Sequence, residues 1–362
     1  SKVQIAGPTA AFATIVAGIV ARNGMDGLAV ATILAGLMLI LMGVLRMGSM
    51  IKFIPYTITT GFTAGIAVTI LIGQLKDFFG LTFTRSPVET MEKVEEVIHT
   101  FHTVNLAAVG VGVLALAVLI VWPKFFKKVP ASLIAVILTA GAVKLMSLPV
   151  NTIGDLYSIS SAVPRFTLPA ISYGTVSAVL PDAFTIAVLA AIESLLSAVV
   201  ADEMIGSRHN SNMELVAQGV GNAASALFGG IPATGAIART AANIKNGGRS
   251  PVAGMVHGVV LLLVLVLLMP YAALIPMPCI AAILFQVAYN MSGWRTVIKV
   301  VNHSPKSDVA VLVVTFLLTV VFDLVVAIAV GLSLACLLFM KRMADVASVK
   351  EWNYVEDTQD DQ

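Results

Sequence analysis

The chain has 362 residues, of which 58% are hydrophobic and only 12% are charged, and its formal net charge is +2. A water-soluble domain of this size cannot bury so much apolar surface and still keep a polar exterior. The composition therefore excludes an ordinary water-soluble protein and favours a chain that crosses a lipid bilayer many times. A net charge this close to zero gives no indication of a nucleic acid partner.

Apolar runs of the length that crosses a bilayer as one helix recur along the chain. They cover Leu28–Leu45, Ala107–Trp122, Ser132–Met146, Ala183–Val200, Val252–Leu268 and Val309–Val321. Together with shorter runs that glycines interrupt, they predict about twelve crossings and an all-α polytopic membrane protein. Because the chain opens at Ser1 and not at a methionine, we expect an N-terminal part to be missing.

Basic residues fall in alternate connections between these runs, and the positive-inside rule places such connections in the cytoplasm. The basic positions are Arg46, Lys52, Lys124, Lys127, Lys128, Lys245, Arg249, Arg295, Lys299, Lys306, Lys341 and Arg342. Residues 1–349 are therefore predicted to form one membrane domain with a cytoplasmic C-terminus. The polar, acidic stretch 350–362 is interpreted as a linker.

One outward-facing connection is predicted to hold a helix of its own. Ser86-Pro87-Val88-Glu89 is typical of a helix start. In a helix up to Phe101, apolar residues would form a stripe along one face, with acidic residues on the opposite face. This pattern favours an amphipathic helix lying on the membrane surface, where its expected role is to brace the bundle.

Two short segments interrupt the helical pattern in similar ways. They are residues 4–11 and residues 229–239, and each has a few extended residues, a Gly/Pro/Thr kink and small residues that can start a helix. Paired broken segments are the best sequence indication of a transporter's binding site, because irregular backbone at membrane depth must line a cavity or lie within protein. Ordinary kinks at helix contacts are the alternative.

Glu193 lies in the middle of an apolar run, where an ionisable side chain needs a wet cavity or a partner. It is a candidate carrier of a coupling proton or sodium ion, and Ser197, four residues on, is expected on the same helix face. A structural hydrogen bond or a salt bridge, for instance to Arg239, is the alternative. Asp202 and His209 are interpreted as solvated loop residues. The chain shows no phosphate-binding loop, metal-ligand spacing or nucleophile motif, so no enzyme activity and no cofactor are expected.

With these motifs the chain resembles the SulP (sulfate permease) family of anion transporters, and in particular its bacterial dicarboxylate-type branch. The similar stretches span almost the whole chain. They are Ser1-Lys2, residues 6–12 and 61–66, residues 191–196, residues 214–219, and residues 229–234 continuing through Arg239 to Asn243.

The resemblance implies a fold of two inverted seven-segment repeats with a core and a gate domain, in which two short strands lead into half-helices. It implies an anion between the half-helix ends, an elevator-type cycle, a homodimer and a location in the bacterial inner membrane. The implied substrate-binding residues are Thr9, Ala10, Ala11, Gly235, Ala236, Ile237 and Arg239. The residues expected to bind the coupling ion are Glu193 and Ser197. By the same resemblance, we expect the family's first two membrane segments, and the STAS domain that follows its last segment, to lie outside this sequence.

We therefore expect a secondary active importer of small anions, with proton-coupled symport of C4-dicarboxylates such as fumarate or succinate as the leading hypothesis. Sodium-coupled uptake of bicarbonate or sulfate is the alternative within the same class. A passive anion channel or a voltage-responsive motor is the alternative from another class, and a nucleobase permease is a third.

Overall fold

The fold is that of a computed structural model, which describes residues 1–49, 56–87, 89–126, 129–159, 162–322, 327, 330–331, 333–338 and 340. The predicted 350–362 linker lies outside the described residues. The elements are β1 (Ala6–Gly7), α1 (Ala10–Val44), α2 (Tyr56–Phe79), α3 (Thr90–Thr100), α4 (Leu106–Phe125), α5 (Ala131–Leu145), α6 (Ile153–Leu156), α7 (Tyr173–Ile205), α8 (Ser211–Leu227), β2 (Thr234–Gly235), α9 (Ile237–Lys245), α10 (Val252–Ala272), α11 (Met277–Met291), α12 (Trp294–His303) and α13 (Lys306–Val321).

The all-α prediction is confirmed. The six long apolar runs lie in helices α1, α4, α5, α7, α10 and α13, and only the runs in α1 and α5 extend one residue beyond the end of their helix. Five of the described helices, α1, α2, α4, α7 and α10, are long and apolar enough to cross a membrane by themselves. These five helices do not reach the expected count of about twelve crossings. Other described helices, such as α8, α9 and α11, are shorter than the length that crosses a bilayer alone. Helix α1 combines two segments that meet at Gly24, where φ is +67°.

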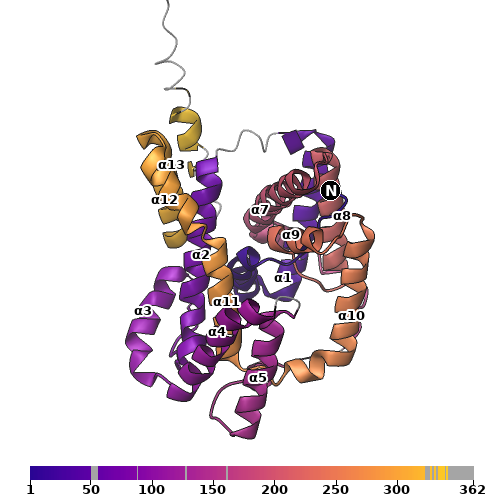
Figure 1. The fold of residues 1–362 in the computed structure, drawn as a ribbon. Helices are drawn as coiled ribbons and strands as arrows, with labels where there is room; N and C mark the ends of the chain where they lie inside the picture. The colour runs from indigo at the N-terminus through magenta and orange to yellow at the C-terminus, as the bar shows by residue number, and fades with distance from the viewer. Residues whose placement is uncertain are drawn as a thin grey trace, which may run out of the picture.

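Two bundles make up the molecule (Figure 1). The first, which we call the core bundle, contains α1, α7, α8 and α9 with the two strands between them. Helices α1 and α8 approach closely, because a Cβ at Gly36 would lie only 2.6 Å from the carbonyl oxygen of Gly219. Glycine at this crossing lets the two backbones touch, as it does in other membrane helix pairs.

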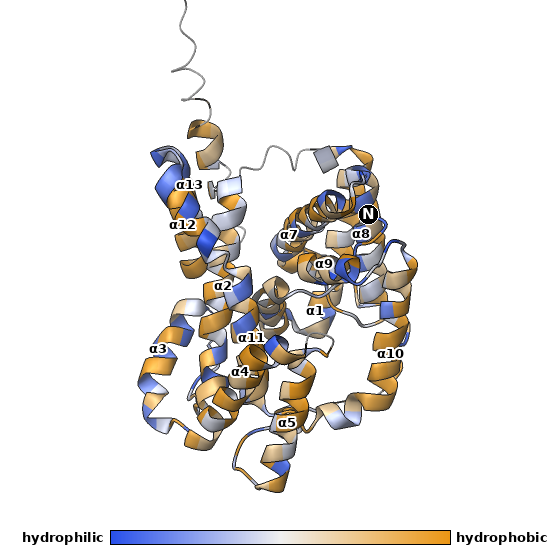
Figure 2. Ribbon diagram, in the orientation of Figure 1, coloured by the Kyte–Doolittle hydropathy of each residue, from blue (hydrophilic) through white to orange (hydrophobic). Residues whose placement is uncertain are grey.

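The second bundle, which we call the gate bundle, packs α2 against α11 and α13 and packs α4 against α5 and α11. Its contacts also depend on glycine, since a Cβ at Gly61 would lie 2.5 Å from the carbonyl oxygen of Leu312. Helix α10 runs along the outside of the molecule and has no buried residue, and its surface is almost entirely apolar (Figure 2). We expect lipid to cover such a helix.

The helix expected near residues 88–101 exists, but its predicted start is wrong. Helix α3 begins at Thr90, and its N-cap is Glu89, which forms a capping box with Glu92. Figure 1 shows α3 running beside α2 and not flat across the end of the bundle. Glu96 is buried and accepts hydrogen bonds from the Thr84 N–H (2.7 Å) and hydroxyl (2.6 Å), so a polar contact anchors α3 to the connection that follows α2.

The glycine contact between α1 and α8 leads to a stability prediction. We expect Gly219→Ala to lower the free energy of unfolding by about 1–3 kcal/mol, because the added methyl group meets the backbone of Gly36 and Ile40. Thermal unfolding in detergent measures the effect. Gly221→Ala on the same helix is the matched control, since nothing lies within 4 Å of a Cβ there. Equal unfolding temperatures for the two variants would contradict the prediction.

The anchor of α3 leads to a prediction about pH. Hydrogen bonds from the Thr84 hydroxyl and N–H hold the pKa of Glu96 below its ordinary value of 4.5. Since the folded-state pKa is the lower one, the anchor contributes stability fully above about pH 4.5 and loses it as the pH falls through the lowered value. We expect faster hydrogen exchange of the α3 amides in acid, after correction for the intrinsic rate.

Two variants check this assignment. Glu96→Gln removes the titrating group, so the α3 amides should exchange faster than in the unmodified chain at neutral pH and with less dependence on pH. Glu95→Gln changes a neighbouring carboxyl group that is 67% exposed, and it should leave the exchange rates unchanged. An identical acid response in all three proteins would show that another group releases the helix.

Candidate functional site

The site is built on a short antiparallel pairing between β1 and β2. Ala6 pairs with Gly235 and Gly7 pairs with Thr234, and the Ala236 N–H donates to the carbonyl oxygen of Ile5 at 3.0 Å. The pairing joins the two broken segments that the sequence predicts, and because it is antiparallel, α1 and α9 begin beyond its opposite ends. Each strand leads directly into a helix, as expected.

Each strand carries a glycine, against which a side chain from the opposite segment lies directly. A Cβ at Gly7 would meet the guanidinium of Arg239, and a Cβ at Gly235 would meet the amide of Gln4. A side chain at either position would have to displace the end of Arg239 or Gln4 from the strand pair.

The helix starts carry the partial positive charge. The N-cap of α1 is Thr9 and that of α9 is Ala236, and in the described part of the chain neither side chain caps the first turn. In proteins generally, first-turn N–H groups without such a cap, together with the helix dipole, favour a bound anion over a cation. The predicted residues Ala10 and Ala11 lie in the first turn of α1, and Ile237 and Arg239 lie in the first turn of α9.

Glu193 reaches this site from α7. The Thr9 hydroxyl donates to its Oε2 atom at 2.9 Å, which is why the hydroxyl does not cap α1. The alternative, a salt bridge between Glu193 and Arg239, does not form, because no ion pair among the described residues joins these two side chains. Instead, the Arg239 guanidinium donates to the carbonyl oxygen of Pro8 at 2.7 Å. An acid and a base therefore flank the start of α1.

Ser197 does not share a contact with Glu193, although the two are four residues apart. Its hydroxyl is fully buried and donates to Thr240 Oγ1 at 3.1 Å. Thr240 Oγ1 also accepts the N–H of Ile5 at 3.1 Å. Ser197 therefore ties α7 to α9 through Thr240, which in turn holds the residue before β1. The expectation that Ser197 lines an ion site beside Glu193 has no contact in its support.

Three side chains of the site were missed by sequence reasoning. Ser194 Oγ accepts the N–H of Gly235 at 3.0 Å and lies 2.9 Å from Thr234 Oγ1, and the Gln4 amide donates to the carbonyl oxygen of Ser194 at 2.9 Å. Ser194 and Thr234 are fully buried. The signal available in the sequence was a pair of hydroxyl residues, Ser194 and Ser197, which follow Glu193 inside an apolar run.

The turn after α7 is ordered by side chains that were expected to be solvated. His209 Nδ1 lies 2.7 Å from Asp202 Oδ2, and its Nε2 lies 2.9 Å from the Ser211 hydroxyl. An acid, a histidine and a serine linked in this order form the catalytic triad of many hydrolases. Here, however, the N–H groups of Asn212 and Met213 at the start of α8 donate to the Asn210 side chain. The hydrogen bonds of Asp202 and His209 therefore tie the turn between α7 and α8 together.

Among the described residues, no group of three His, Cys, Asp or Glu side chains is arranged to hold a metal ion. The chemistry that the site supports is therefore the binding of an anion by two helix starts, beside one carboxyl group and one guanidinium.

Comparisons with known proteins agree with this chemistry. The sequence pattern described as "Sulfate permease family" matches residues 1–315. YvdB of Bacillus subtilis, whose name gives it provisionally as a sulfate transporter, is 44% identical over 351 residues, or 96% of this chain and 66% of YvdB. The bicarbonate transporter BicA of Synechocystis is 33% identical over 345 residues, or 92% of this chain and 59% of BicA. The chain thus spans less than two thirds of the length of these relatives, and both carry names of transporters and not of enzymes.

Solved structures share the fold. The transmembrane domain of a cyanobacterial bicarbonate transporter BicA superposes with a TM-score of 0.78 at 29% identity, covering 92% of this chain and 84% of that one. The murine anion transporter Slc26a9 in its inward-facing state gives a TM-score of 0.84 over 94% of this chain and 61% of that one. At 18% identity the second likeness shows the fold alone.

The contacts of Ser194 generate a prediction. We expect Ser194→Ala to lower the free energy of unfolding by about 1–3 kcal/mol, because the buried Gly235 N–H and Thr234 hydroxyl lose a partner. Ser177→Ala is the matched control on the same helix, since its hydroxyl is exposed and bonds only to the carbonyl oxygen of Gly174. Chemical or thermal unfolding of both variants measures the difference, and a Ser194→Ala protein as stable as the control would contradict this role.

Proposed function

Because this chain belongs to the sulfate permease family, we propose that it is the membrane part of a secondary active transporter that imports a small anion together with a cation. The observation that carries the proposal is the arrangement of two uncapped helix starts, joined by β1 and β2, beside the single carboxyl group of Glu193.

The anion is assigned to the ends of α1 and α9. First-turn N–H groups and aligned dipoles favour an anion without a full positive charge nearby. The Arg239 guanidinium, held against the carbonyl oxygen of Pro8, adds a full charge at the start of α1. Thr9, Ala10 and Ala11 on one side and Gly235, Ala236, Ile237 and Arg239 on the other are the proposed contact residues.

Electrostatics gives a reason for coupling. An ionised Glu193 would repel an anion at the start of α1, because the Thr9 hydroxyl links its carboxylate directly to that helix end. Two like charges roughly 6 Å apart repel by roughly 3 kcal/mol at an effective dielectric constant of about 20. A proton or sodium ion on Glu193 would remove this repulsion and raise anion affinity by about a hundredfold. Anion and cation would then bind together, which is symport.

The two curated relatives favour sulfate or bicarbonate over the C4-dicarboxylate that the sequence first suggested, since neither YvdB nor BicA is named for a dicarboxylate. A small tetrahedral or planar oxyanion also suits two helix ends that share one short strand pair. We therefore rank sulfate and bicarbonate first and keep fumarate as a competitor in the assay.

The contacts between the two bundles support an elevator-type cycle. The membrane in which we place this cycle is the bacterial inner membrane. Among the described residues, no hydrogen bond or ion pair runs between α1, α7, α8 or α9 and α2, α4, α5 or α11, and their shared core is apolar. Apolar surfaces without directional bonds can slide against one another more easily than hydrogen-bonded ones. A homodimer with a cytoplasmic C-terminus completes the proposal.

Uptake into proteoliposomes tests the function. We expect labelled sulfate or bicarbonate to accumulate in vesicles that contain the full-length protein, driven by an inward proton or sodium gradient. Glu193→Gln mimics the neutral side chain, so we expect it to abolish accumulation against a gradient while anion binding persists. Glu203→Gln, at an exposed carboxyl group near the end of the same helix, should transport normally.

Each other outcome has a definite meaning. Accumulation of fumarate, with no effect of sulfate or bicarbonate, would restore the dicarboxylate assignment. Flux that only equilibrates the anion, unchanged in Glu193→Gln, would indicate a passive channel and overturn the symport proposal.

A further inference from the structure

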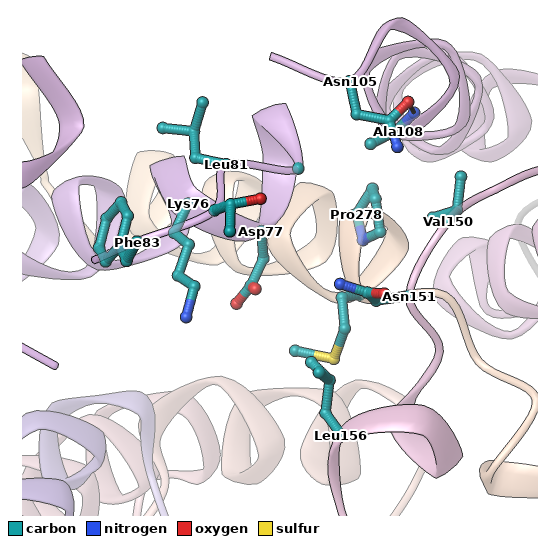
Figure 3. Close-up of a pocket in the computed structure, with 13 residues that line it drawn as sticks. Lys76, Asp77, Leu81, Phe83, Asn105, Ala108, Val150, Asn151, Leu156 and Pro278 are labelled. Carbon is teal, nitrogen blue, oxygen red and sulfur yellow. Dashed lines mark hydrogen bonds between the residues drawn. The ribbon is translucent and has the colours of Figure 1, made fainter. Parts of the chain in front are cut away.

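A cavity lies in the gate bundle, at the end where α2 finishes and α4 and α11 begin. Its volume is about 240 Å³. Figure 3 shows Lys76 and Asp77 pointing the same way from the last turn of α2 into a space bounded by Asn151, Leu156 and Pro278. The cavity is separate from the strand pair, so a ligand bound in it would not depend on the proposed transport of an anion.

The two charges in this cavity are not paired with each other. The Lys76 ammonium lies 5.1 Å from the centroid of the Phe83 ring, in a cation–π contact. In the described part of the chain, the partly buried Asp77 carboxylate forms no ion pair and accepts no hydrogen bond. Lys76 and Asp77 are the ionisable residues among those that line the cavity. The space therefore presents one cation and one carboxylate at neighbouring positions, which act on each other electrostatically without forming an ion pair.

This pattern narrows the chemistry of a ligand. A simple anion would be attracted to Lys76 but repelled by Asp77. A divalent metal ion needs more ligands than one carboxylate, and among the described residues no cluster of three candidate ligands exists. A ligand that carries both charges satisfies both side chains at once, with its ammonium group donating to Asp77 in a charge-assisted hydrogen bond.

We propose that this cavity binds a zwitterion with an ammonium group and an anionic group, held by Asp77 and Lys76 respectively. Its volume is below the roughly 300–1,000 Å³ of sites for drug-sized ligands, so the ligand is of headgroup size. Its place at the ends of membrane helices makes the headgroup of an ethanolamine phospholipid one source. Free phosphoethanolamine or an amino acid is the other source of the same chemistry.

Binding to the purified full-length protein in detergent tests the proposal. Dissociation constants are measured for a short-chain phosphatidylethanolamine, for phosphatidylcholine and phosphatidylglycerol with the same chains, and for free phosphoethanolamine. We expect phosphatidylethanolamine to bind more tightly than phosphatidylcholine, whose quaternary ammonium has no N–H to donate. Asp77→Asn and Lys76→Gln should each weaken binding by about tenfold, the usual effect of losing a hydrogen bond to a charged group.

The controls and outcomes separate the sources. Glu203→Gln and Lys245→Gln remove one charge of each sign away from the cavity and should leave binding unchanged. Tight binding of free phosphoethanolamine assigns the site to a soluble zwitterion, and binding of the lipid alone assigns it to the bilayer. The double variant Lys76→Asp with Asp77→Lys keeps both charges if the single variants fold poorly. Binding that neither Asp77→Asn nor Lys76→Gln changes, or a preference for phosphatidylglycerol, overturns the proposal.

Discussion

The antiparallel contact between β1 and β2 is the constraint on which the rest of the site depends. It is only two residues long on each side, yet it fixes where two helices begin inside an apolar bundle. Extended backbone in such surroundings must find partners for its N–H and C=O groups. The pairing supplies some of them, and hydroxyl groups on neighbouring elements supply others, as Ser194 does for the N–H of Gly235 and Thr240 for the N–H of Ile5.

This need for partners explains why α7 carries polar side chains in an otherwise apolar stretch. Ser194 and Ser197 face the strands and are fully buried, whereas Glu193 is only partly buried and meets Thr9 at the start of α1. One helix therefore does two separate tasks with adjacent residues. Its serines hold the strand pair in place, and its carboxyl group contacts the helix end where the proposed anion would bind.

The sequence alone predicted the parts that depend on composition and on local pattern. Long apolar runs predicted the helices, and the repeated Gly/Pro/Thr kinks predicted two strand-to-helix segments that belong together. The contacts between side chains were less predictable, because helical spacing places Ser197 on the same side as Glu193 but does not say which neighbour each one meets. Asp202 and His209 were expected to be solvated for the same reason, since nothing local indicates that a turn will bring them 2.7 Å apart. The start of α3 was misplaced by a few residues because the capping box at this helix is formed by Glu89 with Glu92 and does not begin at Ser86.

The distribution of glycine separates the surfaces that are locked from those that can move. Within the core bundle, Gly36 and Gly219 bring two backbones into contact, and within the gate bundle Gly61 and Gly65 do the same against α13. Such contacts tolerate little displacement, because even a methyl group does not fit. Between the bundles the shared core consists of side chains such as Phe12, Phe62 and Ile66, and no hydrogen bond joins the described helices of the two bundles across it. A motion that carried the strand pair across the membrane would therefore cost least along this boundary, with each bundle moving as a rigid body and Glu193 travelling together with the helix starts that it contacts.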